Sequence, residues 1–236
     1  AEEVAFSFHD KKADRGFYTL AFNWTIDPKL IQSARSLEEP AVQGYQELTN
    51  PGDGQRYVRI PGGEFRYGCS LKEDKECGAD EKPGVRVKLS PYWIGKYEVN
   101  NRAFQKWTQE SGIITQGDDF PATNVSWLDA ASFCKWTGGS LATEAQWEFA
   151  ARAGFTASDQ IDWNNVVYKE KTVVGLKKVE IGQSNNYGLY NMLGNAMEWV
   201  LDTYSSTFYR VLTDGVQDPV NHSEGTEKVT RGGAHD

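Results

Sequence analysis

Cysteine and histidine are scarce in this chain of 236 residues, which holds three of each. His9, His222 and His235 lie far apart, and none belongs to the HxxxH or HxxE spacing that is typical of a metal triad. No CxxC or His–Cys cluster accompanies the cysteines, so they are not expected to bind a metal. A GxSxG nucleophile motif and P-loop spacing are also missing.

Long apolar runs and basic stretches are absent too. No apolar run approaches the roughly 18 residues that a membrane helix requires. The formal net charge of −8, without a basic stripe, argues against nucleic-acid binding. The composition, with 39% hydrophobic and 13% aromatic residues, is typical of a globular protein. Eight Trp and 23 Gly predict an irregular, loop-rich fold in which aromatic side chains fill the gaps between short elements.

The cysteines and the first residues favour an oxidising compartment. Cys69 and Cys77 bracket the polar loop SLKEDKE, and a disulfide there would contribute roughly 2–3 kcal/mol in the chain-entropy model. Cys134 lies in an apolar helical pattern, where it is either a buried thiol or the partner of a group outside this sequence. The start Ala-Glu-Glu is what removal of a signal peptide would leave, although trimming leaves the same start. We therefore expect a periplasmic or secreted protein.

The chain divides at a linker predicted over residues 50–54. We expect residues 1–55 to form an N-terminal extension that packs on the main domain, with strands at Val4–Phe8 and Phe17–Trp24 and helix-compatible sequence over Pro28–Leu48. Residues 56–236 form the main domain. Its first half is strand-like in RYVRIPGGEFRYG and again from Val85 to Val99.

Three helices are predicted in the main domain. The first begins at Asn100 or Asn101 and stops at Gly112. The second begins with the capping-box pattern SWLD at Ser126 and buries Ala130, Phe133 and Cys134. The third begins at Thr143, carries Trp147, Ala150 and Ala151 toward the core, and ends at Gly154. Short strands and loops without further helices are expected after that.

The stretch NYGLYNMLGNAMEW, residues 186–199, is the most informative of the chain. A hard cation such as Ca²⁺ takes six to eight oxygens from carboxylates, carboxamides and main-chain carbonyls. Four are on offer within eight residues: Asn191 Oδ1, the carbonyls of Gly194 and Ala196, and the Glu198 carboxylate. The alternative is that Asn191 and Asn195 cap turns and that Glu198 makes an ordinary buried hydrogen bond.

Five blocks resemble the formylglycine-generating-enzyme (sulfatase-modifying factor) domain family, in its typical order: RIPGGEFRYG, DEKPGVRVKLSPYWIGKYEVNNRAF, FPATNVSWLDAASFCKWTGGSLATEAQWEFAARAG, NNYGLYNMLGNAMEW and VTRGG. The resemblance covers residues 56–236. It implies an α+β, formylglycine-generating-enzyme-like (C-type-lectin-like) fold with little regular secondary structure. It also implies structural calcium on Asn191, Gly194, Ala196 and Glu198. A second family calcium site would fall around Asn165 and Val166, but its carboxylate partner has no clear match in KKVEIGQ.

The catalytic pattern of that family is not matched. Its enzymes bind copper through a cysteine pair after an RGGS motif, and thiolates suit Cu(I). Here the segment reads Arg231-Gly-Gly-Ala-His-Asp236, so that Ala234 replaces the Ser, and no catalytic residue is assigned. His235 beside Asp236 is either an orienter–base pair or a plain surface histidine.

Two functions follow from the resemblance. The first is an exported, non-catalytic regulator similar to the periplasmic type VI secretion-associated regulators of the TagR branch. It would bind another protein, either the periplasmic sensor domain of a kinase or an envelope lipoprotein, and activate a membrane kinase. The second is a metal-dependent oxidase, of formylglycine-generating or siderophore-maturation type, whose active site a further C-terminal segment would complete.

Overall fold

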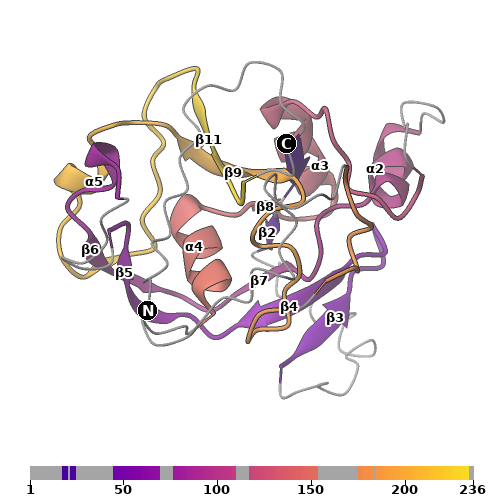
Figure 1. Cartoon of the computed structure of the whole chain (residues 1–236), viewed down its shortest axis with the longest axis horizontal. Coiled ribbons are helices and arrows are strands. Elements are labelled where there is room, and N and C mark those ends of the chain that lie inside the picture. Colours follow the sequence, from indigo (N-terminus) through magenta and orange to yellow (C-terminus); the bar gives the residue numbers. More distant parts are fainter. Residues whose placement is uncertain are drawn as a thin grey trace.

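The computed structural model describes residues 18–20, 22–24, 45–69, 77–109, 117–153, 175–182 and 184–233, the first two ranges by their backbone alone. Its elements are mixed strands and short helices, an α+β fold with modest regular secondary structure (Figure 1). The strand expected at Val4–Phe8 lies outside the described residues, as does the second calcium site expected near Asn165. No helix within the described ranges is long and apolar enough to cross a bilayer.

The largest sheet has five strands in the order β3-β4-β7-β2-β8. They are β3 (Glu47–Thr49), β4 (Arg56–Ile60), β7 (Tyr92–Gly95), β2 (Phe22–Trp24) and β8 (Ser140–Leu141). β2 pairs antiparallel with both neighbours, Asn23 opposite Ile94 on one side and Ser140 on the other. A segment from the start of the chain therefore lies inside the sheet.

The other strands of the described residues form two three-stranded sheets. One has the order β10-β6-β5 and comprises β10 (Val216–Gln217), β6 (Val85–Leu89) and β5 (Gly63–Tyr67). The other has the order β1-β9-β11 and comprises β1 (Tyr18–Leu20), β9 (Met197–Thr203) and β11 (Lys228–Arg231). Strict alternation of buried and exposed residues in β6, VRVKL, explains its place with one face on the core.

The predicted helices form with the expected caps. They are α2 (Asn101–Thr108), α3 (Trp127–Trp136) and α4 (Glu144–Arg152), and Figure 1 shows α4 in the middle of the molecule. Asn100, Ser126 and Thr143 each accept a hydrogen bond from the backbone N–H three residues on. Trp147 is fully buried at the centre of one hydrophobic cluster, and Phe133 occupies a second cluster with Cys134.

Four details differ from the prediction. α2 ends at Thr108, four residues before Gly112, because Gln109 adopts a left-handed conformation and donates its N–H to Gln105 O. Helix-compatible sequence was expected up to Leu48, yet residues 47–49 form β3, since β4 offers a strand edge. Residues 50–54 are the turn of that hairpin, closed by Gly54 N donating to Asn50 O, and not a linker. Among the described residues beyond 155, where no helix was expected, the structure has α5 (Phe208–Val211).

The predicted disulfide is present. Cys69 and Cys77 are bonded, with their Cα atoms 5.8 Å apart, and Cys134 is a free, buried thiol. The bond ties the end of β5 to the short 3-10 helix η3 (Ala79–Glu81). Tyr204 donates its hydroxyl to Asp80 of η3, and Arg210 of α5 donates to Ala79 O, so the disulfide-bonded corner is anchored to the C-terminal part of the domain.

Candidate metal centre

Backbone hydrogen bonds join the predicted calcium loop to two other segments. Tyr190 N donates to Lys96 O just after β7, and Gly194 N donates to Gly232 O after β11, at 2.6 Å. Asn191, Gly194 and Asn195 have φ of 54°, 81° and 63°, the left-handed region that Gly and Asn tolerate best. These conformations turn the chain sharply before it enters β9.

Glu198 points into the core from β9. Its side chain is 2% exposed and accepts a hydrogen bond from Trp147 Nε1 of α4. Burial raises the pKa of Glu198 to about 8, because the charged carboxylate has lost its water. The alternative anticipated for Glu198, an ordinary buried hydrogen bond, is thus present, and it is made by Oε2.

A second buried carboxylate, Glu98, lies at the same place. It is 1% exposed and belongs to the connection between β7 and α2. Glu98 Oε2 accepts hydrogen bonds from Asn191 Nδ2 at 2.9 Å and Asn195 Nδ2 at 2.7 Å, while Oε1 has no partner. Burial and the nearby charge of Glu198 raise its pKa well above the ordinary value.

Sequence reasoning missed Glu98. The signal that could have found it is a lone acid in the apolar and aromatic run YWIGKYEV, where strand alternation places it inward. A carboxylate at a core position needs a partner. Its partners lie 93 and 97 residues further along the chain, so only the fold reveals them.

The donor set fits a hard divalent cation. Asn191, Gly194 and Ala196 belong to the loop before β9 and Glu198 is the second residue of β9, while Glu98 adds a buried carboxylate oxygen, Oε1, that makes no hydrogen bond. Asn191 uses its amide nitrogen toward Glu98 and Val179 O, which reserves its oxygen for another interaction. Among the described residues, no Lys or Arg forms an ion pair with either glutamate. Two buried carboxylates with amide and carbonyl oxygens are a typical Ca²⁺ environment.

Arg231 of the RGG segment has a structural role. Its guanidinium is 2% exposed and pairs with Glu144 at 3.1 Å and Glu148 at 2.8 Å, both on α4. Those carboxylates raise its pKa further, against the effect of burial. Tyr67 donates its hydroxyl to Glu144, and Asp202 accepts from Glu144 N and Asn221 N. His235 and Asp236 lie outside the described residues, so their pairing stays a prediction.

A family profile described as the sulfatase-modifying factor enzyme 1-like domain matches residues 45–236. The chain belongs to this family. It is 27% identical over 250 residues to the formylglycine-generating enzyme of Thermomonospora curvata, covering 75% of this chain and 81% of that one. The inactive C-alpha-formylglycine-generating enzyme 2 of Mus musculus is 25% identical over 215 residues, with 62% and 68% covered.

The chain is also similar to part of a protein that has a different name. The serine/threonine-protein kinase pkn1 of Chlamydia caviae is 27% identical over 233 residues, which cover 84% of this chain and 36% of the kinase. Among solved structures, PvdO from Pseudomonas aeruginosa superposes with a TM-score of 0.66 at 22% identity, covering 84% of this chain and 87% of that one. At this identity the likeness concerns the fold.

Proposed function

We propose that this protein is an exported, non-catalytic regulator that uses a sulfatase-modifying factor scaffold to bind a protein partner. The state of its cysteines carries the proposal. Two of the three are joined in a disulfide, and the third, Cys134, is 0% exposed with its pKa raised by burial. A copper-dependent oxidase of this family type needs accessible thiolates, and these cysteines offer none.

The relatives support a regulatory use of the scaffold. One is named an inactive formylglycine-generating enzyme, and another bears the name of a kinase. We infer that the partner is the periplasmic sensor domain of a membrane kinase or an envelope lipoprotein, in a role similar to that of the TagR branch in type VI secretion. The disulfide supports a periplasmic or secreted location, where such bonds persist.

Calcium has a structural role in this proposal. Asn191, Glu198 and the carbonyls of Gly194 and Ala196 would hold the ion, with Glu98 as an additional carboxylate. The ion would balance two buried carboxylates that form no ion pair with a Lys or Arg among the described residues. The loop, the β7–α2 connection and β9 would then be fixed relative to one another, which presents a constant surface to the partner.

Copper loading and turnover test the proposal. The full-length protein is incubated with Cu(I), and O₂ uptake and oxidation of a cysteine-containing peptide are measured beside a formylglycine-generating enzyme as positive control. We expect neither O₂ uptake nor peptide oxidation above the metal-only blank. Stoichiometric copper together with turnover would overturn the proposal and support the oxidase function.

Binding is measured separately. Isothermal titration of the purified chain with the periplasmic domain of a membrane kinase from the same organism should give saturable binding, and cell fractionation should find the chain outside the cytoplasm. A cytoplasmic location would contradict the proposal, because neither expected partner is reachable from there.

A further inference from the structure

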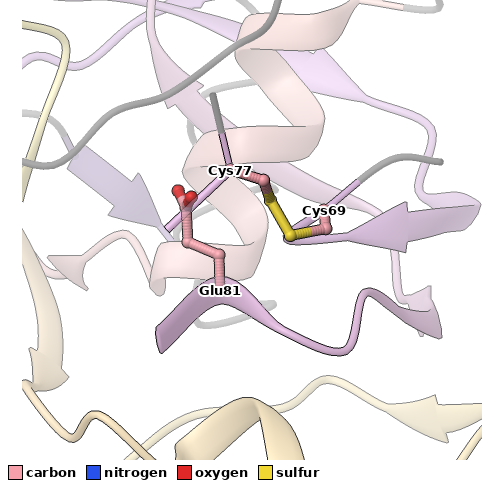
Figure 2. Close-up of side chains that lie close together, drawn as sticks. All are labelled: Cys69, Cys77 and Glu81. Atoms are coloured by element: carbon pink, nitrogen blue, oxygen red, sulfur yellow. A yellow bond between two sulfur atoms is a disulfide. The ribbon is translucent and has the colours of Figure 1, made fainter. Parts of the chain in front are cut away.

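The Cys69–Cys77 disulfide has a carboxylate beside it. Figure 2 shows the two sulfur atoms bonded to each other and the side chain of Glu81 next to them. The two Sγ atoms and a carboxylate oxygen of Glu81 all lie within 4.8 Å of one another. Glu81 is 3% exposed and Cys69 is 8% exposed, so this acid lies beside sulfur and not in water.

Hydrogen bonds connect Cys69, Glu81 and Gly78, the residue after Cys77, independently of the S–S bond. Cys69 N donates to Glu81 O at 3.3 Å, and Arg66 Nε donates to Cys69 O at 3.1 Å. Gly78 N donates to Glu81 Oε2 at 2.6 Å, and Glu81 N donates to Gly78 O at 3.2 Å. The turn that follows Cys77 is thus fixed to the strand end that carries Cys69.

Close packing reinforces this arrangement. A Cβ added at Gly84 would overlap the carbonyl of Cys69, and one added at Gly68 would lie 2.8 Å from Glu81 O. These backbones touch, so neither segment has room to shift toward the other. We therefore expect Cys69, Cys77 and Glu81 to stay together when the disulfide is opened.

We propose that reduction of this disulfide creates a zinc site on Cys69, Cys77 and Glu81. A dithiol reductant supplies two electrons and two protons, its own thiols becoming a disulfide while the Cys69–Cys77 bond breaks into two thiols. Zn²⁺ then displaces both thiol protons and binds two thiolates and one carboxylate oxygen, with water completing four ligands.

The metal would close the same loop that the disulfide closes. The sequence separation of the two cysteines is 8, and either crosslink restrains that segment. The corner that anchors η3 to Tyr204 and Arg210 would keep its fold in either redox state. This site is distinct from the calcium centre in residues and in donor type, because thiolates favour zinc over hard cations.

Zinc competition against a chromogenic chelator tests the proposal, in buffer with about 1 mM Ca²⁺ so that the calcium centre is not available to zinc. Protein reduced with a phosphine and kept free of oxygen should withdraw about one equivalent of Zn²⁺ from the chelator. Oxidised protein should withdraw none. Zn²⁺ should also raise the Tm of the reduced protein and leave that of the oxidised protein unchanged.

Variants identify the ligands. The double variant Cys69→Ser/Cys77→Ser keeps Cys134 and should bind no zinc under reducing conditions. Glu81→Gln keeps both cysteines and should bind zinc at least about tenfold more weakly. Glu64→Gln removes an equal charge from an exposed position of the neighbouring strand β5 and should bind zinc as the original chain does.

Equal zinc binding by the reduced and oxidised proteins would overturn the proposal, as would full binding by the double serine variant. An affinity unaffected by Glu81→Gln would also overturn it, since the carboxylate would then not be a ligand. Should Glu81→Gln fail to fold, zinc-dependent thiolate absorbance in the ultraviolet of the reduced original chain decides, and its absence refutes the site.

Discussion

Chelation of calcium should destabilise this protein measurably. Without a cation, the fold buries Glu98 and Glu198 close to each other; the Ala196 N–H lies near the Glu98 carboxylate, but Oε1 makes no hydrogen bond of ordinary geometry. An unsatisfied buried polar group alone costs about 1–3 kcal/mol. Ligand linkage gives a similar figure, since free calcium at 100 times Kd stabilises the folded state by about 2.7 kcal/mol.

The assay is thermal unfolding with and without calcium. In a domain of this size each kcal/mol shifts Tm by about 2–4 °C, so EGTA should lower Tm by about 5–10 °C relative to 1 mM free Ca²⁺. Mg²⁺ at the same concentration should restore less, because it requires octahedral geometry and retains its waters. Ionic strength is matched throughout, so that screening contributes nothing to the difference.

Two isosteric variants locate the response. Glu198→Gln and Glu98→Gln each remove one buried carboxylate with little change in volume. Each should weaken calcium binding at least about tenfold, which at a fixed calcium concentration lowers the stabilisation by calcium by about 1.4 kcal/mol. In EGTA both variants should be at least as stable as the original chain, because burying a neutral amide costs less free energy than burying a carboxylate. Glu64→Gln, at an exposed position, should keep the full response.

Identical Tm values in EGTA and in calcium would refute the reasoning. A calcium response that persists in both glutamine variants would place the ion elsewhere. Either result would leave the two buried carboxylates to be explained by protonation alone.

Three further predictions concern other parts of the fold. Arg231→Met should lower the free energy of unfolding by about 3–5 kcal/mol in urea titrations, because two buried glutamates lose their cation; a change below about 1 kcal/mol would contradict the ion-pair network. Cys69→Ser should cost about 2–3 kcal/mol without reductant and nothing with excess reductant, in metal-free buffer; equal costs in both buffers would show that the crosslink does not stabilise the fold. Burial raises the pKa of Asp202 to about 7, with the neighbouring charge of Glu144 as a second cause, so its stabilising contribution is complete below about pH 4 and is lost as pH rises through 7. The unfolding free energy of Asp202→Asn should therefore fall less between pH 5 and 8 than that of the original chain, and equal slopes would exclude Asp202 as the titrating group.

Local signals in the sequence were sufficient for the helices that begin at side-chain caps. Ser126 and Thr143 each cap the helix they were expected to cap, because such a cap depends on residues three positions apart. The end of α2 was wrong for a related reason. Gln109 has a left-handed conformation that is usual for Gly or Asn, so its residue type does not predict the end of the helix there.

The features that the sequence did not predict, β3 and the role of Glu98, depend on pairing with distant segments. β3 forms where the residue types permit a helix, since residues 47–49 complete the edge of β4. Glu98 was missed because both asparagines that hold it are more than 90 residues away. Residue type and spacing within one loop could suggest Asn191 and Glu198 as ligands, but no local pattern could supply the second carboxylate.

The arrangement of charges along β9 gives a physical reason for the calcium proposal. Its buried positions alternate, so Glu198, Val200 and Asp202 share the inward face. At the Asp202 end the fold provides its own cation, because Arg231 is paired with the two glutamates of α4. At the Glu198 end two carboxylates meet. Arg231 lies opposite Glu198 in the β9–β11 ladder, but its ion pairs are with Glu144 and Glu148, and the donors that the structure gives to Glu98 and Glu198 are two side-chain amides and an indole N–H. Neutral donors relieve only part of the cost of burying two charges, whereas one divalent ion would balance both. If chelation leaves Tm unchanged, the charge of the two carboxylates must be reduced in another way, and Glu98 or Glu198 must then carry a proton at neutral pH.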